Sequence, residues 1–182
     1  MTTGIDLGRP TSGDVIDLIS DDHRRFELLL SQLRLGTADR DAVRRAFADV
    51  LVAHGEAEEE LVYPVLRKAA DDVDEHDVEH GKQEHAEGND ALLAVLELKG
   101  TDTQSFTDAV EKLSNLVAHH VAEEELTILE PARTEVSATV RWDLGEKWAT
   151  RRNQLIDEGC GSLENVRRIV AAAQREGLLD DA

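Results

Sequence analysis

Along most of the chain, apolar residues recur at steps of three and four, which is the spacing of one face of an α-helix. The stretch from 14 to 35 shows this with Ile16, Ile19, Phe26, Leu30 and Leu33. We expect Ser12 to mark the start of this helix and Gly36 to end it. Similar stretches cover about 39–68 and 73–98, and another begins in the cap-rich run 101–103. The pattern predicts four amphipathic helices.

The connections between these helices are short, so neighbouring helices should lie antiparallel in an up-down-up-down four-helix bundle. Two further helical stretches follow Pro131, at about 136–157 and 162–175, with a turn at Gly159-Cys160-Gly161 between them. We therefore predict an all-α fold. A bundle domain should cover residues 1–131, and a C-terminal helical extension should cover 132–182 and pack on the bundle without chemistry of its own.

Composition narrows the class of protein. Aromatic residues make up 3% and hydrophobic residues 41%, a balance that suits packed helices better than a sheet. The net charge of -19 would repel a phosphate backbone, so we expect no nucleic-acid partner. A single cysteine excludes an intrachain disulfide and a multi-thiolate metal site. No stretch resembles a signal peptide or a membrane span, so we expect a cytoplasmic protein that does not contact a membrane.

All seven histidines lie in the four predicted bundle helices. In the segment HGEAEEELVYP, His54 and Glu58 are four residues apart and share one helix face. Both continue the apolar stripe of their helix, so both should point inward. A buried histidine beside a buried carboxylate is costly unless something pairs with them. A metal ion would do so, and bundle cores commonly build metal sites in this way.

The fourth helix repeats the arrangement in HHVAEEELTILEP, where two registers are open. His119 could act with Glu123, or His120 with Glu124. The apolar stripe of this helix continues to positions 120 and 124, whereas position 119 falls on the solvent side. We therefore expect His120 and Glu124 to face the core and His119 to lie on the surface.

The first helix contributes His23, which lies on its inner stripe. The third helix offers His76, His80 and His85, of which His85 lies on the apolar face. The layout also looks duplicated: the spacing from His23 to the histidine of the second helix matches that from His85 to the fourth helix within about one turn. His85 is therefore favoured, with His80 kept as an extra ligand should Gly81 and Gly88 allow the helix to bulge. The predicted inward-facing set is His23, His54, Glu58, His85, His120 and Glu124.

Six such ligands divide evenly between two metal ions, with two terminal histidines for each ion and with Glu58 and Glu124 as bridges. Imidazole and carboxylate together suit iron, whereas zinc more often takes a closed tetrahedral set. We predict two non-haem iron ions, although manganese or a mixed pair would fit the same ligands. Without metal the two carboxylates should repel each other, so at least one of them should take up a proton.

The segments DDHRRFELLLSQL, AHGEAEEELVYPVL, QEHAEGNDALLAVLE and AHHVAEEELTILEP resemble the hemerythrin-like family, also called the HHE cation-binding domain. The resemblance covers roughly residues 14–131, and it implies the same six ligands. Oxygen-carrying hemerythrins resemble the chain less closely. They have a fifth histidine on the third helix and HxxxxD on the fourth, where this chain has HxxxE with Glu125 following. This departure weighs against reversible oxygen carriage.

The resemblance implies a di-iron protein that binds or senses dioxygen, nitric oxide or peroxide. One alternative is an enzyme, a di-iron oxidoreductase that decomposes hydrogen peroxide as a catalase does. Another is a bundle in which metal serves stability alone. Against the structural alternative stands the cost of burying two carboxylates where leucine would stabilise the core better. The sequence leaves open which small molecule is bound and whether the protein is an enzyme.

Overall fold

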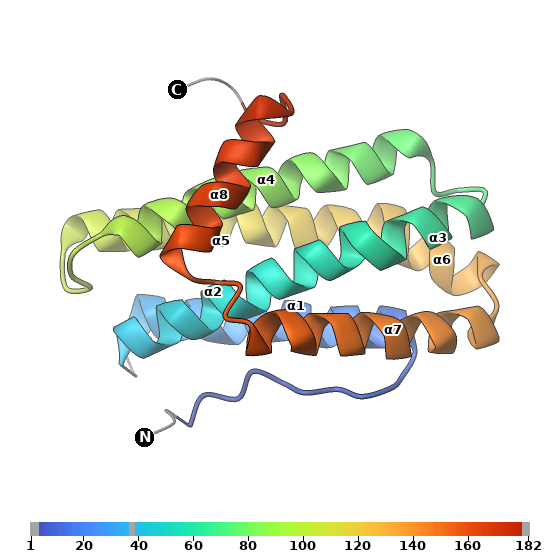
Figure 1. Ribbon diagram of the computed structural model, residues 1–182, viewed down its shortest axis with the longest axis horizontal. Coiled ribbons are helices and arrows are strands. Elements are labelled where there is room, and N and C mark those ends of the chain that lie inside the picture. The colour runs from blue at the N-terminus through green and yellow to red at the C-terminus, as the bar shows by residue number, and fades with distance from the viewer. Residues whose placement is uncertain (1–3, 37–38, 180–182) are drawn as a thin grey trace.

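The computed structural model describes residues 4–36 and 39–179, and within these ranges every regular element is helical (Figure 1). The elements are α1 Val15–Leu35, α2 Arg40–Ala57, the π-helix η1 Glu58–Val62, α3 Tyr63–Ala69, α4 Glu75–Glu97, α5 Gln104–Glu124, the π-helix η2 Glu125–Leu129, α6 Glu130–Glu135, α7 Ala138–Asp157 and α8 Leu163–Arg175. The predicted all-α class is confirmed.

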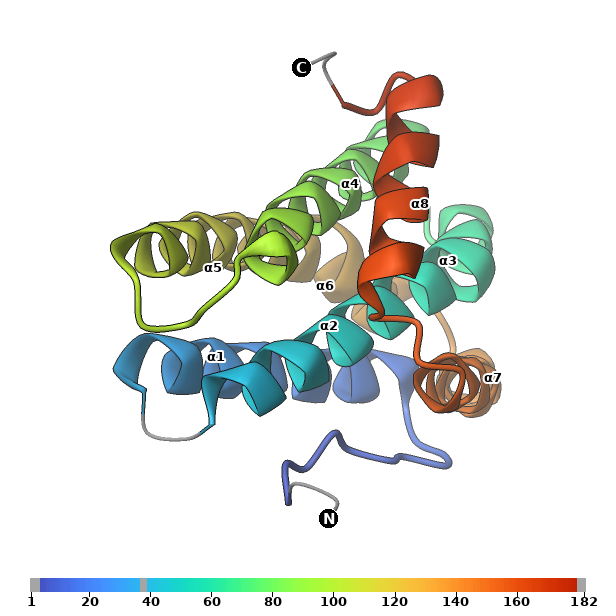
Figure 2. The same cartoon turned by 60° about the vertical axis from the view of Figure 1, so that its left-hand side comes forward.

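The bundle is built from two helix pairs. Helices α1 and α2 pack together, and so do α4 and α5, while α1 also contacts α5 and α2 contacts α4. Figure 2 shows the two pairs as two layers, with α7 beside the α1–α2 layer and α8 crossing α4. The architecture is therefore an antiparallel four-helix bundle with additional C-terminal helices, as expected from the short connections.

The helix ends follow from local capping chemistry. Asp14, and not Ser12 as expected, caps α1, because its side chain accepts a hydrogen bond from the backbone N–H of Ile16 at 3.1 Å. Gly36 ends α1 in the left-handed conformation, with φ of 62°, as the sequence predicts. Helix α4 starts at a capping box formed by Asp74 and Asp77. These caps fix where each helix begins relative to its inward-facing residues.

The C-terminal helices share the core of the bundle. Leu155 of α7 and Val166 of α8 are buried in one apolar cluster with residues of α1, α2, α4 and α5. Trp148 of α7 is fully buried in a second cluster with Tyr63 and residues of α1. At Gly161, a Cβ atom would lie only 2.3 Å from the backbone nitrogen of Asp49, so only glycine allows this close approach.

Two π-helices interrupt the second and fourth bundle helices, where the sequence pattern predicts an unbroken helix. The segment η1 begins at Glu58, and η2 begins directly after Glu124. Each ends just before a helix with proline in its first turn, Pro64 or Pro131. Proline lacks an N–H group and its ring collides with the carbonyl four residues earlier, so a locally widened turn relieves the clash. Such π segments often occur at functional sites.

Candidate metal centre

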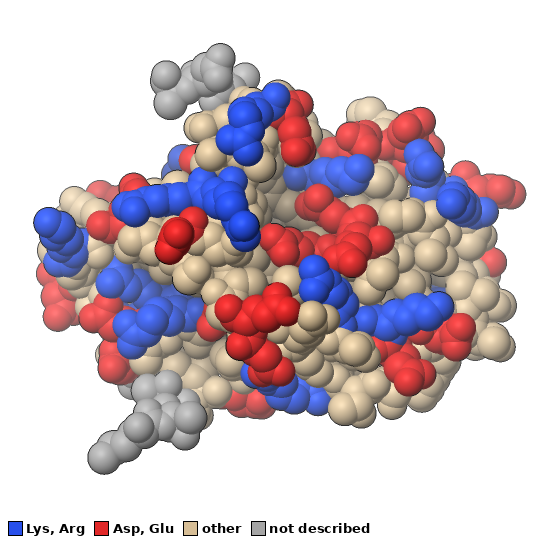
Figure 3. Space-filling view, in the orientation of Figure 1, with Lys and Arg blue, Asp and Glu red and all other residues tan. Residues whose placement is uncertain are grey.

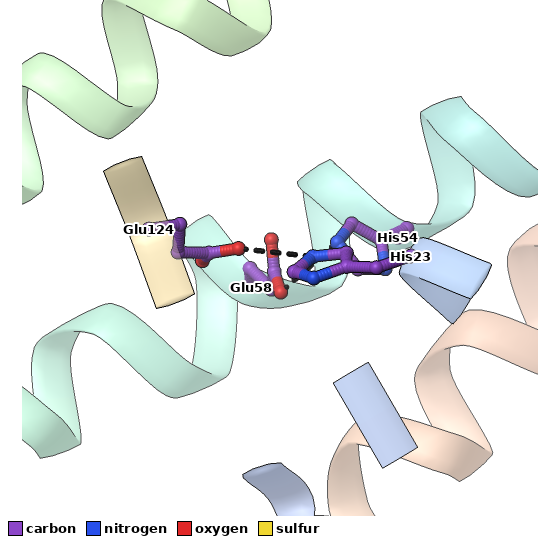
Figure 4. A group of neighbouring side chains, drawn as sticks. All are labelled: His23, His54, Glu58 and Glu124. Atoms are coloured by element: carbon purple, nitrogen blue, oxygen red, sulfur yellow. Dashed lines mark ion pairs between the residues drawn. The ribbon is translucent and has the colours of Figure 1, made fainter. Parts of the chain in front are cut away.

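The structure brings the six predicted side chains together between the two helix pairs. One group consists of His23, His54, Glu58 and Glu124, whose side chains point toward one another in Figure 4. A second group consists of Glu58, His85 and His120. Within each group, one potential ligand atom from every residue lies within 4.8 Å of the others. Glu58 belongs to both groups, which makes the two groups adjacent.

Each of the two glutamates lies between two imidazoles. Oε1 of Glu58 is 3.1 Å from Nε2 of His54, and its Oε2 is 3.4 Å from Nε2 of His85. Oε2 of Glu124 lies 3.2 Å from Nε2 of the α1 histidine and 3.7 Å from Nε2 of the α5 histidine. All four Nε2 atoms therefore face a common centre, with a carboxylate on either side of it.

A second carboxylate lies behind every one of these histidines, at the Nδ1 atom of its ring. The Nδ1 contacts are His23 with Glu125 at 2.8 Å, His54 with Asp22 at 3.3 Å, His85 with Glu59 at 2.8 Å, and His120 with Glu84 at 3.0 Å. A proton on Nδ1 would be held by this carboxylate, which leaves the Nε2 lone pair for a metal ion. Carboxylate–histidine–metal arrangements orient ligands in this way and raise their basicity.

These four supporting carboxylates were missed by the sequence analysis, although their positions follow a rule. The residue before the histidine of α1 or α4 is acidic, Asp22 or Glu84, and it contacts the histidine of the following helix. The residue after each central glutamate is Glu59 or Glu125, and it contacts a histidine of the other helix pair. The duplicated pattern is thus (D/E)H followed by HxxxEE, which could have revealed them.

Several buried polar atoms of the centre lack a hydrogen-bond partner among the described residues. They are Nε2 of His23, Nε2 of His54, both carboxylate oxygens of Glu58, and Oε2 of Glu124. A buried polar group without a partner costs about 1–3 kcal/mol. Cations bound at the two groups would satisfy these atoms, so the residues present fit a metal centre.

Protonation in the metal-free centre differs from the expectation. Burial alone would lower the pKa of His23 and of His85, but the neighbouring glutamate carboxylates raise the pKa to about 9 and about 10, respectively. Burial alone would raise the pKa of Glu58 and of Glu124, yet the adjacent histidines hold the pKa of both carboxyls below the usual value. The expected proton on a glutamate is therefore wrong, because the histidines hold the protons.

Tyr63 is a further residue of the centre that the sequence analysis overlooked. It is fully buried, and its hydroxyl donates a hydrogen bond to Oε1 of Glu124 at 2.9 Å. Its ring stacks on His85 at a centroid distance of 5.8 Å. Burial and the nearby carboxylates raise the pKa of Tyr63 well above its usual value, so in the absence of metal it stays a hydrogen-bond donor. In the sequence, the signal that could have pointed to this residue is that the chain's single tyrosine directly precedes Pro64, close to Glu58.

The C-terminal extension also reaches the centre, where no chemistry was expected of it. Arg152 of α7 is fully buried, and its Nη2 donates to Oδ1 of Asp22 at 2.8 Å. Asp22 in turn contacts His54. Arg152 also donates to the backbone carbonyls of Leu7 and Gly8. The guanidinium neutralises a buried carboxylate that orients a histidine of the centre.

The remaining histidines lie outside the centre. The side chain of His119 is 63% exposed, so the register that places His120 in the core is the one observed. The side chain of His80 is 44% exposed and its Nε2 lies 3.7 Å from Glu84, so it does not join either converging group. His76 lies at the exposed start of α4 beside Asp74.

Comparison with known proteins identifies the fold. The family model described as the hemerythrin HHE cation binding domain matches residues 14–132. A DNA nickase from Nostoc sp. is 28% identical over 140 residues, which are 75% of this chain but only 37% of the nickase. No solved structure gives a significant match. Among the described residues, no helix combines the length and apolar character needed to cross a membrane. Because the family model covers more than half of the chain, the chain belongs to the hemerythrin HHE cation-binding domain family.

Proposed function

We propose that this protein holds two non-haem iron ions at the six converging side chains and binds or senses a small molecule such as dioxygen, nitric oxide or peroxide. The observation that carries the proposal is the set of buried imidazole and carboxylate atoms around Glu58 and Glu124 that lack hydrogen-bond partners among the described residues. Evenly divided, these residues give one ion His23 and His54 and the other ion His85 and His120.

The donor set supports iron. It combines imidazole nitrogen with carboxylate oxygen, and none of its members is a thiolate, since Cys160 is the chain's one cysteine. Manganese suits the same donors, and metal analysis distinguishes the two. When bound, the metal pair would supply a redox-active centre with coordination positions left for a small molecule. The protein's own residues orient the imidazoles through their Nδ1 contacts and exclude bulk water from the bundle core.

A second candidate function is the decomposition of hydrogen peroxide. The hydroxyl of Tyr63 beside Glu124, and the carboxylate of Glu84 behind His120, give the centre ionisable groups, as proton transfer during turnover would require. The two functions differ in stoichiometry. A protein that binds or senses a small molecule takes up one equivalent per centre and can release it unchanged. An enzyme converts many equivalents of peroxide to dioxygen and water.

The test is to add dioxygen or hydrogen peroxide to the anaerobic, reduced, iron-loaded protein and to follow the absorption spectrum together with evolved dioxygen. A reversible spectral change with one equivalent would support binding or sensing. Many turnovers with dioxygen release would support the enzyme. No reaction with either molecule would leave a metal that serves stability alone and would overturn the proposal.

We propose a small molecule, and not nucleic acid, as the partner of this chain. The relative from Nostoc sp. is named a DNA nickase, but the match to this chain covers only 37% of that protein. The chain carries a net charge of -19, and on the face shown in Figure 3 the basic side chains are interspersed with acidic ones. Such a surface disfavours phosphate contacts. Incubation with supercoiled plasmid should leave it intact, and metal-dependent nicking would contradict this part of the proposal.

The division into a metal-binding bundle over residues 1–131 and a C-terminal extension over 132–182 is likewise proposed. Its support is that all six converging side chains lie before residue 132. The extension then supplies Arg152 behind Asp22 and the helix α8 beside the centre.

A further inference from the structure

A cavity of about 240 Å³ lies beside the metal centre, between α2, α4, α5 and α8. His85 and His120 line its inner end. Its walls are mainly apolar and include Phe26, Leu51, Val117, Ile169, Ala172 and Ala173. Three of these residues belong to α8, which lies beyond the family match at residue 132. Since an apolar cavity of about 150 Å³ admits benzene, this one has room for a molecule much larger than dioxygen.

The cavity extends up to Gly88 of α4, the helix that carries His85. Gly88 is buried in the interior of α4 and lines the cavity, yet a Cβ atom added there would meet no atom of the described chain within 4 Å beyond its own helix backbone and neighbours. Alanine would therefore fit, and it would favour the helix by about 1 kcal/mol. The chain keeps glycine at a position where a side chain would only reduce the cavity.

Glu84 lines the same cavity, although one of its carboxylate oxygens is closed off from it. Its Oε2 contacts Nδ1 of His120 at 3.0 Å, whereas its Oε1 has no hydrogen-bond partner among the residues the structure describes. The nearest ring nitrogens belong to His119 and His80, at 3.5 and 3.7 Å, and neither forms a hydrogen bond with it. Glu84 is only 7% exposed, so this oxygen is poorly placed to be satisfied by bulk water. Glu84, His85 and His120 together give the cavity a polar region beside its apolar walls, which suits a ligand with one polar group.

We propose that this cavity binds a small uncharged molecule with an apolar body and one O–H end, of the alcohol or organic hydroperoxide class. The apolar body lies against α8 and Phe26, and the O–H group lies at the polar end of the cavity, formed by Glu84, His85 and His120. Anions are disfavoured because Glu56, Glu59 and Glu176 also line the cavity, against the single cation of Lys82. Figure 3 shows acidic side chains gathered on the surface beside α8. What the ligand does at the centre depends on the proposed di-iron function. The binding of the ligand in the cavity does not depend on it.

The test is calorimetric titration of the metal-loaded protein with cyclohexanol, and with cyclohexanecarboxylate as the anion of similar shape. We expect saturable binding of cyclohexanol and at least tenfold weaker binding of the carboxylate. Gly88→Leu and Ala173→Phe both fill the cavity, and each should weaken cyclohexanol binding at least tenfold. The matched control is Ala118→Phe, which adds the same bulk at an exposed position outside the cavity, in a separate hollow lined by His23. It should bind as the unsubstituted protein does.

Circular dichroism and metal content of every variant separate loss of the site from loss of the fold. The inference is overturned if the unsubstituted protein does not bind cyclohexanol, if both probes bind equally, or if Ala118→Phe weakens binding as much as Ala173→Phe. Metal analysis of the same sample keeps the two proposals apart. Two irons without cyclohexanol binding would overturn the cavity alone. Cyclohexanol binding to protein without iron would support the cavity and contradict the di-iron function.

Discussion

His119 and His120 are adjacent in the sequence and occupy opposite environments. His120 is buried against Glu84 and Glu124, whereas the side chain of His119 is 63% exposed. We predict that His120→Ala loses at least one metal ion per chain, because it removes an Nε2 atom that faces the centre. His119→Ala should retain the full metal content. Metal analysis of the two purified variants checks this, and equal losses would show that the assigned helix face is wrong.

A single buried arginine stabilises a carboxylate that orients one of the histidines. Arg152→Leu leaves the buried charge of Asp22 with only the guanidinium of Arg25, at 3.1 Å, so it should lower the free energy of unfolding by about 3 kcal/mol. The control is Arg151→Leu, which breaks an ion pair with Glu60 at a half-exposed site and should cost about 0–1 kcal/mol. Urea unfolding measures both.

The double variant Asp22→Leu, Arg152→Leu separates stability from metal binding. It removes both buried charges, so it should recover much of the lost stability. It also leaves Nδ1 of His54 without its carboxylate, so the metal affinity should still fall by about 10–100-fold. A double variant as unstable as Arg152→Leu, or one with unchanged metal affinity, would contradict this account of Asp22.

At the scale of elements, the two interior glycines of α4 differ in what surrounds them. An added Cβ at Gly88 meets open space, whereas one at Gly81 would lie 2.9 Å from the hydroxyl oxygen of Tyr63, which is fully buried. We predict that Gly88→Ala raises the free energy of unfolding by about 1 kcal/mol. Gly81→Ala should bring no such gain, because it displaces the hydroxyl that donates to Glu124. Urea unfolding compares them, and equal stabilisation would place Tyr63 elsewhere.

The sequence predicted the helices and the six converging residues because both depend on periodicity along one helix. The stripes that carry His54 and His120 continue apolar positions, so their inward direction could be read locally. Periodicity does not single out Asp22 and Glu84, because they lie next to the stripe and meet histidines of another helix, and only the duplicated pattern marks their positions. Arg152 is 130 residues from Asp22 and lies in a helix without histidine. Only the packing of helices reveals such contacts.

The π-helices mark a second limit of the sequence pattern. Hydrophobic periodicity does not distinguish an α-helix from one widened over a single turn, so the stretch 39–68 reads as one helix. The signal was present in Pro64 and Pro131, each of which follows an acidic run. Each proline clashes with the carbonyl four residues earlier, and a helix can relieve this clash by kinking, by ending or by widening one turn. The sequence does not reveal which of these occurs.

At the scale of the whole molecule, metal and protons compete for the same histidines. In the metal-free protein the pKa of His23 is about 9 and that of His85 about 10, above the ordinary 6.5. A raised histidine pKa contributes stability that is complete below pH 6.5 and is lost as the pH rises through 9 to 10. The chelated protein should therefore become less stable from pH 6.5 to 10, as measured by urea unfolding. A rise in stability over this range would contradict the assigned protonation.

Metal binding should show the opposite dependence on pH. Metal ions require neutral imidazoles, so loading the chelated protein at pH 7 should release at least two protons per chain, from His23 and His85 and in part from His54, whose pKa is also raised by Glu58 and Asp22. The apparent metal affinity should therefore rise with pH up to about pH 10, the pKa of His85. Proton release in a weakly buffered solution with a pH indicator measures this, and loading without release would mean that His23 and His85 are neutral beforehand.

The most direct test of the central claim is elemental analysis of iron, manganese and zinc in the purified protein, expressed per chain. Two groups of ligand atoms that share Glu58, with four inward Nε2 atoms, predict close to two irons per chain. His120→Ala, which weakens one of the groups, should bring the value toward one. One tightly held zinc ion per chain, with no iron, would contradict the di-iron centre.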